Sequence, residues 1–300
     1  MYKLIAVDMD GTLLRNDKTI SKETYTAIES AKAKGVKIVL CTGRPIQGVQ
    51  GTLKYLNLIS DSDYVVTCSG AVVQCTGTSE IISQTNLTPK DAAFLYNLSK
   101  KLNITLNAVT PDYLITPTLN FTTGVEAYLT NLPVKIVDFD TLNENIPIRR
   151  IAYINETQPF IDKIKSLVKH LDVKYTALDV FNRNDSLFCD PNNLPDELYE
   201  KYTVLKPSSN TLEILSKNAN KGTGVAVLAE KLGIKRYEII CIGDSGNDID
   251  MIKYAGLGVA MGNAFPEIKK IADYVTLTNE ENGVAHVINK FILKKEEKAV

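Results

Sequence analysis

Short and mostly apolar runs mark the two ends of the chain. They occur at 3–7, 36–41 and 64–67 near the N-terminus, and again at 238–242 and 257–260. Runs of this length without a helical period are typical of strands that are buried on both sides. Such strands occur mainly in parallel sheets whose two faces are covered by helices. The pattern therefore predicts buried parallel strands at both ends of the chain.

Segments of helical character separate these strands. Ser21 is a suitable N-cap for a helix that runs through Lys34, and Gly35 would close that helix. Further helices are expected at 221–231 and 283–291. Strands that alternate with helices in this way predict an α/β fold with a doubly wound, Rossmann-like parallel-sheet core.

The middle of the chain has a different pattern. From about residue 84 to residue 210 it is rich in Asn, Thr and Pro, and segments such as 150–154 have the period of an antiparallel strand. A helical pattern at 160–170 is expected to cover one face of that sheet. The sequence therefore predicts a discontinuous core domain at 1–83 and 211–300, and an inserted α+β cap domain at 84–210.

Composition excludes several classes of function. A chain of 300 residues with 44% apolar and 23% charged residues is typical of a globular protein with two domains. The formal net charge of −1 predicts no general attraction to nucleic acid or anionic membranes, and no apolar run is long enough to span a bilayer. Five cysteines form no CxxC pair, and acidic residues come too early for a secretory signal, so we expect a cytoplasmic protein.

Two acidic residues directly follow the first apolar run. The segment Asp8-Met9-Asp10-Gly11-Thr12 could be an ordinary turn, which Asp and Gly favour. The chemical alternative gives each acid a role. Asp8 would attack a phosphorus centre and form an aspartyl-phosphate, while Asp10 would protonate the leaving oxygen and later activate water. Ligands bind at the carboxyl ends of the strands in such sheets, so both acids should face the binding crevice.

A second acidic cluster, GDSGND at 243–248, follows the run at 238–242. One of its residues is expected to cap the next helix, but capping does not require this density of acids. Hard divalent cations prefer oxygen ligands. We therefore expect Mg²⁺ as the cofactor, bound by Asp8, Asp244 and the backbone carbonyl of Asp10.

The nucleophile needs a fixed cation beside it, because Asp8 and a dianionic phosphate repel each other. Lys221 and Lys217 are the candidates, and Lys221 is preferred since Gly222 permits close approach to a ligand. Asp248, from the second acidic cluster, is expected to hold either this lysine or a metal-bound water.

A polar segment, Thr42-Gly43-Arg44, follows the second apolar run. It could simply separate a strand from a helix. Its functional interpretation is a phosphate cradle, made of a hydroxyl and backbone N–H groups at a helix N-terminus. Asn247 would add a further donor to phosphate. Arg44 would either reach the substrate or pair with a surface acid, and both alternatives stay open.

In this order, DMDGT, TGR, the lysine of NKG and GDSGND resemble the four motifs of the haloacid dehalogenase superfamily. Within it, the chain resembles the Cof-type sugar-phosphatase-like hydrolases, which carry an α/β cap. The resemblance covers about residues 1–83 and 211–292. It implies magnesium-dependent hydrolysis of phosphate esters through a phospho-aspartate, with phosphate bound by the backbone of Met9 and by the Thr42-Gly43 turn. One departure is Ser69-Gly70-Ala71, where relatives commonly have Asn-Gly-Ala.

The sequence thus predicts a phosphatase that acts on a small phosphorylated metabolite, such as a sugar phosphate or a phosphorylated cofactor. A phosphotransferase or mutase would use the same motifs, because the cap selects the acceptor. A signalling receiver also phosphorylates an aspartate, but it needs neither Asp10 nor a cap. A regulator that binds the metabolite without catalysis is a further alternative, and its effect would survive Asp8→Ala.

Overall fold

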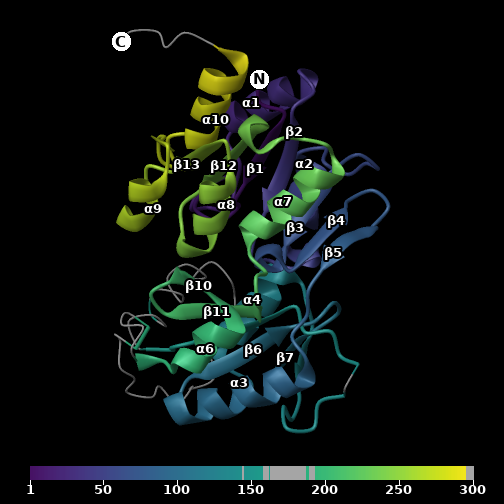
Figure 1. The fold of residues 1–300 in the computed structure, drawn as a ribbon, viewed down its shortest axis with the longest axis vertical. Helices are drawn as coiled ribbons and strands as arrows, with labels where there is room; N and C mark the ends of the chain where they lie inside the picture. Colours follow the sequence, from purple (N-terminus) through teal and green to yellow (C-terminus); the bar gives the residue numbers. More distant parts are fainter. Residues whose placement is uncertain (144, 158–161, 163–186, 189–192, 295–300) are drawn as a thin grey trace. The chain divides into compact units, whose positions relative to one another are not determined.

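The computed structural model describes residues 1–143, 145–157, 162, 187–188 and 193–294. The chain divides into two compact units, one made of Met1–Gln84 with Ala219–Val300 and the other of Thr85–Asn218 (Figure 1). The second boundary differs from the expected residue 210, because strand β11 (Thr211–Ser216) belongs to the sheet of the second unit. The helix expected at 160–170 lies outside the described residues, apart from Asp162.

The first unit is built on an eight-stranded sheet with a parallel centre. Its strands are β1 (Leu4–Val7), β2 (Lys37–Cys41), β3 (Tyr64–Thr67), β4 (Val72–Cys75), β5 (Ile81–Gln84), β12 (Ile239–Gly243), β13 (Leu257–Ala260) and β14 (Tyr274–Val275). They lie in the order β14-β13-β12-β1-β2-β3-β4-β5. Strand β1 is parallel to both of its neighbours, β12 and β2, and β4 runs against its own two neighbours.

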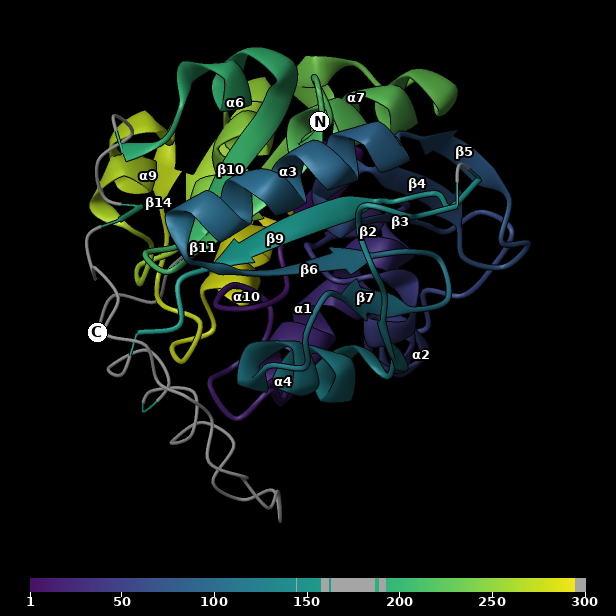
Figure 2. The same ribbon diagram turned by 90° about the horizontal axis from the view of Figure 1, so that it is seen from below.

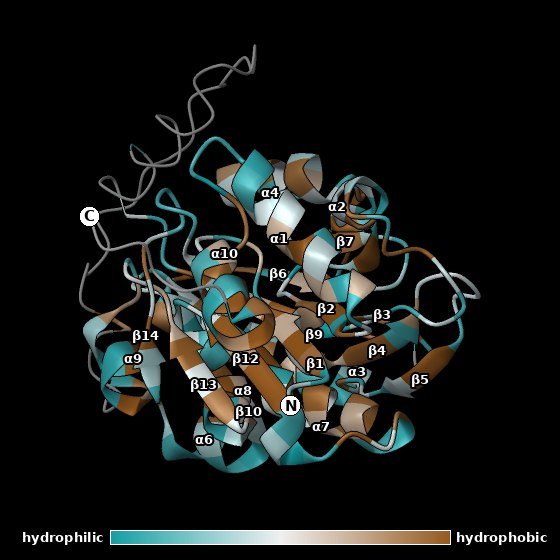
Figure 3. Cartoon of the chain, turned by 90° about the horizontal axis from the view of Figure 1, so that it is seen from above, coloured by the Kyte–Doolittle hydropathy of each residue, from teal (hydrophilic) through white to brown (hydrophobic). Residues whose placement is uncertain are grey.

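Helices on both faces explain why these strands are apolar throughout (Figure 3). Ile5 and Val7 of β1 belong to one apolar cluster, whereas Leu4 and Ala6 belong to another on the opposite face. The first cluster includes residues of α1 (Lys22–Ala33), α2 (Gln50–Tyr55), α9 (Pro266–Ile271) and α10 (Gly283–Val287). The second includes residues of α7 (Lys221–Lys231) and α8 (Ile249–Tyr254). This confirms the predicted doubly wound core.

The first helix has the ends that the sequence predicts. Helix α1 begins after Ser21, whose side chain accepts a hydrogen bond from the backbone N–H of Thr24. It ends at Ala33, and Gly35 follows in the left-handed region with φ +80°. A left-handed residue just past the last turn is the usual way to end a helix, and glycine adopts it without strain.

The second unit is a six-stranded sheet of order β10-β11-β9-β6-β7-β8 (Figure 2). Besides β11, its strands are β6 (Thr105–Val109), β7 (Leu114–Thr116), β8 (Val134–Ile136), β9 (Arg150–Ile154) and β10 (Tyr202–Ser208). The described helices of this unit are α3 (Pro89–Leu102), α4 (Phe121–Thr130) and α6 (Asp196–Lys201). Leu106 and Tyr153 pack with α3 in one apolar cluster. Asn107 and Arg150 alternate with them and bind side chains of α4. The insertion is therefore an α+β unit with its own core.

Two expectations from composition concern the chain as a whole. Among the helices described, none combines the length and apolar character that a membrane span requires. Cys41, Cys68, Cys75 and Cys241 are buried and not joined in disulfides, and Cys189 lies outside the described residues.

Candidate active site

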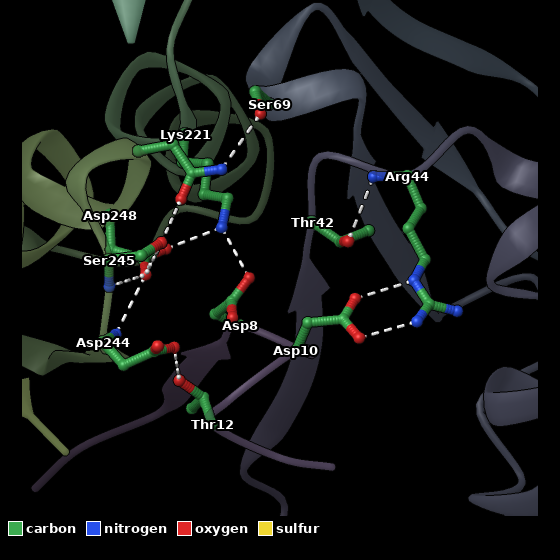
Figure 4. Close-up of polar contacts among 11 residues, drawn as sticks. Asp8, Asp10, Thr12, Thr42, Arg44, Ser69, Lys221, Asp244, Ser245 and Asp248 are labelled. Carbon is green, nitrogen blue, oxygen red and sulfur yellow. Dashed lines mark hydrogen bonds and ion pairs between the residues drawn. The ribbon is translucent and has the colours of Figure 1, made fainter. Parts of the chain in front are cut away.

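The predicted motifs meet at one edge of the core sheet. Asp8 follows β1, Thr42 follows β2, Ser69 follows β3 and Asp244 follows β12. These strands are neighbours in the order β12-β1-β2-β3 and are mutually parallel. Their carboxyl ends therefore lie side by side, which brings residues more than 200 positions apart into one site (Figure 4).

Lys221 lies at the centre of this site. Its side chain is fully buried, and its Nζ donates to Asp8 Oδ1 and to Asp248 Oδ1, both at 2.6 Å. Burial lowers the pKa of Lys221, but Asp248 and Asp8 raise it by more, so the lysine is a permanent cation. The competing candidate, Lys217, donates to the Tyr199 carbonyl in the second unit.

Asp248 holds the lysine and the loop that carries Asp244. Its Oδ1 accepts from Lys221, and its Oδ2 accepts from the backbone N–H groups of Asp244 and Ser245, each at 3.0 Å. Of the two roles expected for Asp248, the structure shows the contact with Lys221. Through these hydrogen bonds Asp248 orients Lys221 and the backbone of Asp244 and Ser245.

Asp244 and Asp8 have the chemistry of a divalent cation site. With Asp248, they present carboxylate oxygens within 4.8 Å of one another. Burial and the neighbouring carboxylate of Asp248 raise the pKa of Asp244 to about 7. Burial also raises the pKa of Asp8, against the effect of Lys221. Buried carboxylates that repel each other are stabilised by a hard cation with oxygen ligands.

The turn after Asp8 is fitted closely against Asp244. Thr12 Oγ1 donates to Asp244 Oδ1 at 2.7 Å. Gly11 has φ +85°, and a Cβ atom there would lie 2.5 Å from Asp244 Oδ2. Only glycine satisfies both conditions. The motif therefore needs Gly11 for the close approach of the turn to the carboxylate as well as for the turn itself.

Asp10 points away from Asp8 and toward Arg44 (Figure 4), and a second cation, Lys18, also binds it. Arg44 Nε donates to Asp10 Oδ2 at 2.8 Å and its Nη2 to Oδ1 at 2.7 Å, while Lys18 Nζ donates to Oδ1 at 2.8 Å. Burial raises the pKa of Asp10, but Arg44 and Lys18 outweigh it and lower the pKa to about 2. The acid that Arg44 contacts is thus Asp10 itself. The sequence analysis missed Lys18, since a lysine in a turn has no distinguishing pattern.

The predicted phosphate-binding residues lie around the same strand ends. Thr42 is buried, and its hydroxyl accepts from the backbone N–H of Arg44 at 3.1 Å, which shapes the turn that contains Gly43. Asn247 is also buried, and its Nδ2 donates to Ser69 Oγ at 3.4 Å. The Met9 side chain lies wholly in the apolar core, so only its backbone is available to a ligand.

The fold and the site together define an α/β enzyme with a buried carboxylate centre that one lysine neutralises in part. The family model for haloacid dehalogenase-like hydrolases matches residues 5–288, and the chain belongs to this family. The Bacillus subtilis (strain 168) protein named "Putative phosphatase YxeH" is 40% identical over 297 residues, which are 98% of this chain and 100% of that protein. The "5-amino-6-(5-phospho-D-ribitylamino)uracil phosphatase YcsE" of the same organism is 29% identical and covers 97% of this chain and 96% of its own.

A solved structure agrees with the fold. The crystal structure of a haloacid dehalogenase-like hydrolase from Bacteroides thetaiotaomicron has 27% identity and a TM-score of 0.74, and the match covers 97% of this chain and 100% of that one. The chain is therefore a hydrolase of the phosphatase class. Its family generally uses a divalent metal ion, for which the acidic cluster offers ligands.

Proposed function

We propose that the chain is a magnesium-dependent phosphatase that hydrolyses small phosphate monoesters through an aspartyl-phosphate on Asp8. The observation that carries this proposal is the position of Lys221, fully buried and 2.6 Å from Asp8 Oδ1. A buried cation fixes the orientation of the carboxylate and offsets its repulsion of an incoming phosphate. The ion pair with Asp248 holds the lysine in that place.

The reaction proceeds in two displacements. A carboxylate oxygen of Asp8 attacks phosphorus, and the bond to the ester oxygen breaks as that oxygen takes a proton from Asp10. Asp10 then removes a proton from water, and the resulting hydroxide releases inorganic phosphate and regenerates Asp8. Bound Mg²⁺ would be held by Asp8, Asp244 and the carbonyl of Asp10, and would offset the negative charge that gathers on the phosphate.

The contacts of Asp10 place a condition on this scheme. Arg44 and Lys18 occupy both carboxylate oxygens, and an acid needs one oxygen free to carry the transferred proton. Arg44 contacts both oxygens, so it must release at least one of them, and that oxygen must take up a proton from water, before the ester oxygen departs. The substrate phosphate is a suitable new partner for Arg44, because guanidinium groups bind phosphate. Thr42, Gly43 and Asn247 would contribute the remaining donors.

The substrate class that we propose is a sugar phosphate or a phosphorylated cofactor or cofactor precursor. The name of YcsE, a relative at 29% identity, describes a phosphatase of a phosphorylated ribityl compound. We also propose that the enzyme works in the cytoplasm, because buried cysteines without disulfides, as in the described part of the chain, are typical of a reducing compartment.

The test is phosphate release from a panel of phosphorylated metabolites, with Mg²⁺ and with a chelator. We expect metal-dependent turnover of one structural class, and a phosphoryl group on Asp8 after acid quenching, detected by peptide mass spectrometry. Asp8→Asn should abolish both signals. Asp61→Asn is the matched control, since Asp61 is exposed in the loop before β3, at the amino end of that strand. Turnover by the Asp8→Asn variant would refute the assignment of the nucleophile.

A further inference from the structure

The turn after β3 has an unusual backbone. Cys68, Ser69 and Gly70 all have positive φ, at 49°, 52° and 98°. Only the third is glycine, and a non-glycine residue in the left-handed region costs roughly 1–2 kcal/mol. Strain of this kind persists only where the surroundings impose it, and it is concentrated at functional sites. The contacts of this segment, which we call the left-handed turn, show what imposes it.

The left-handed turn is tied to the loop that carries Thr42 and Arg44. The backbone N–H of Ser69 donates to the Thr42 carbonyl at 2.9 Å, and that of Cys68 donates to the Arg44 carbonyl at 3.0 Å. The left-handed conformation directs these two successive donors into the neighbouring loop. The position of the proposed phosphate cradle thus depends on the turn.

The same turn supports the start of helix α7. A Cβ atom on Gly70 would lie 2.0 Å from the Asn220 carbonyl oxygen and 2.8 Å from the Lys221 backbone nitrogen. Asn220 is the N-cap of α7 and accepts from Thr223 N. The backbone that presents Lys221 to Asp8 therefore rests directly on Gly70.

The third contact involves Asn247. Its Nδ2 donates to Ser69 Oγ at 3.4 Å, and both side chains are buried. The Ser69 hydroxyl makes this contact from a residue whose backbone is in the left-handed conformation. One three-residue segment thus contacts the TGR loop, the lysine helix and Asn247.

We propose that the left-handed turn sets the relative positions of Lys221, Asn247 and the phosphate cradle, with Gly70 and Ser69 as its positioning residues. This inference rests on the proposed function, in which those three groups act on the same phosphate. Neither positioning residue needs to touch the substrate. Each acts through the group that it places.

The decisive variant is Gly70→Ala, compared with Gly35→Ala and Gly233→Ala. All three glycines have positive φ, but a Cβ atom on Gly35 or Gly233 meets nothing within 4 Å. The two control variants therefore have an alanine in the same strained backbone conformation, but its Cβ atom collides with no neighbouring atom. Relief of the 2.0 Å contact requires the start of α7 to move by about 1 Å, a misplacement that can cost about a hundredfold in rate. We expect kcat to fall by about that factor in Gly70→Ala alone, with KM little changed.

Chemical labelling of the Lys221 amine detects a displacement of this residue without any measurement of activity. Lys221 is fully buried, so a small amine-modifying reagent should leave it unlabelled in the native chain and in both controls. In Gly70→Ala it should be labelled, as peptide mass spectrometry would show. Should the native chain release no phosphate from any compound, the proposed function fails, while the labelling still tests the positioning. Equal kcat and equal protection of Lys221 in all three variants would overturn the inference.

The Ser69 variants provide a second test if Gly70→Ala does not fold. Ser69→Ala removes the oxygen that Asn247 contacts, and we expect inorganic phosphate to bind about fivefold more weakly, the value of one hydrogen bond of about 1 kcal/mol. Ser69→Asn keeps a polar partner and tolerates the left-handed backbone, so it should retain most of the affinity. Equal affinity in Ser69→Ala and the native chain, measured by calorimetry, would remove Ser69 from the proposal.

Discussion

Replacement of Lys221 by methionine tests the electrostatic basis of the site. Methionine has a similar length and no charge, so Lys221→Met leaves Asp8 and Asp248 buried without their shared cation. Unit charges 2.6 Å apart attract by about 6 kcal/mol at an effective dielectric constant of about 20. Much of that attraction offsets the cost of burying the charges. Loss of one partner from a buried ion pair therefore typically destabilises a protein by about 3–5 kcal/mol.

We expect Lys221→Met to lower the free energy of unfolding by this amount in urea denaturation. It should also lower kcat by about 10²–10³-fold, the usual effect of removing one group that stabilises developing negative charge. Lys217→Met is the matched control. Lys217 is exposed and its Nζ donates to the Tyr199 carbonyl at the surface, so Lys217→Met should change stability by less than about 0.5 kcal/mol.

A double variant separates charge from packing. If unpaired negative charge causes the loss, Lys221→Met combined with Asp248→Asn should be more stable than Lys221→Met alone, while kcat stays about 10²–10³-fold below that of the native chain. A double variant no more stable than the single one would point to packing. A Lys221→Met protein within about 1 kcal/mol of the native chain, with unchanged kcat, would refute the electrostatic argument altogether.

Three further predictions concern other parts of the molecule. Gly11→Ala should abolish phosphate release, because the new Cβ atom would lie 2.5 Å from Asp244 Oδ2; retained activity would contradict this. Mg²⁺ should raise the thermal midpoint of the native chain but not of Asp244→Ala, and an equal rise in both would place the metal elsewhere. Asp91→Ala removes the capping box of α3 and should cost about 1 kcal/mol at pH 7. Burial raises the pKa of Asp91, but hydrogen bonds from Thr88 outweigh it, so this stability is present above about pH 4 and should vanish in more acidic solution.

The sequence alone was sufficient for those features that depend on local pattern. Apolar runs without alternation predicted strands buried on both faces, and the described core has them. The acidic motifs could be placed at strand ends for the same reason, since each follows its run directly. Parallel strands present their carboxyl ends at one edge, so Asp8 and Asp244 could be expected to meet before any contact was known. Their individual roles remain predictions that the proposed variants test.

Only the tertiary structure revealed the contacts between segments whose own patterns are unremarkable. Lys18 is an ordinary turn lysine until the chain folds back to bring it to Asp10. Gly70 has the composition of any turn, and its role depends on the Asn220 carbonyl, 150 positions further along the chain. The strand at 211–216 shows the same limit. Its pairing with β9 and β10, which no local pattern encodes, decides that it belongs to the second unit. Strand pairing and side-chain contacts between distant segments depend on how whole elements pack together, and for that reason they appear only in the folded chain.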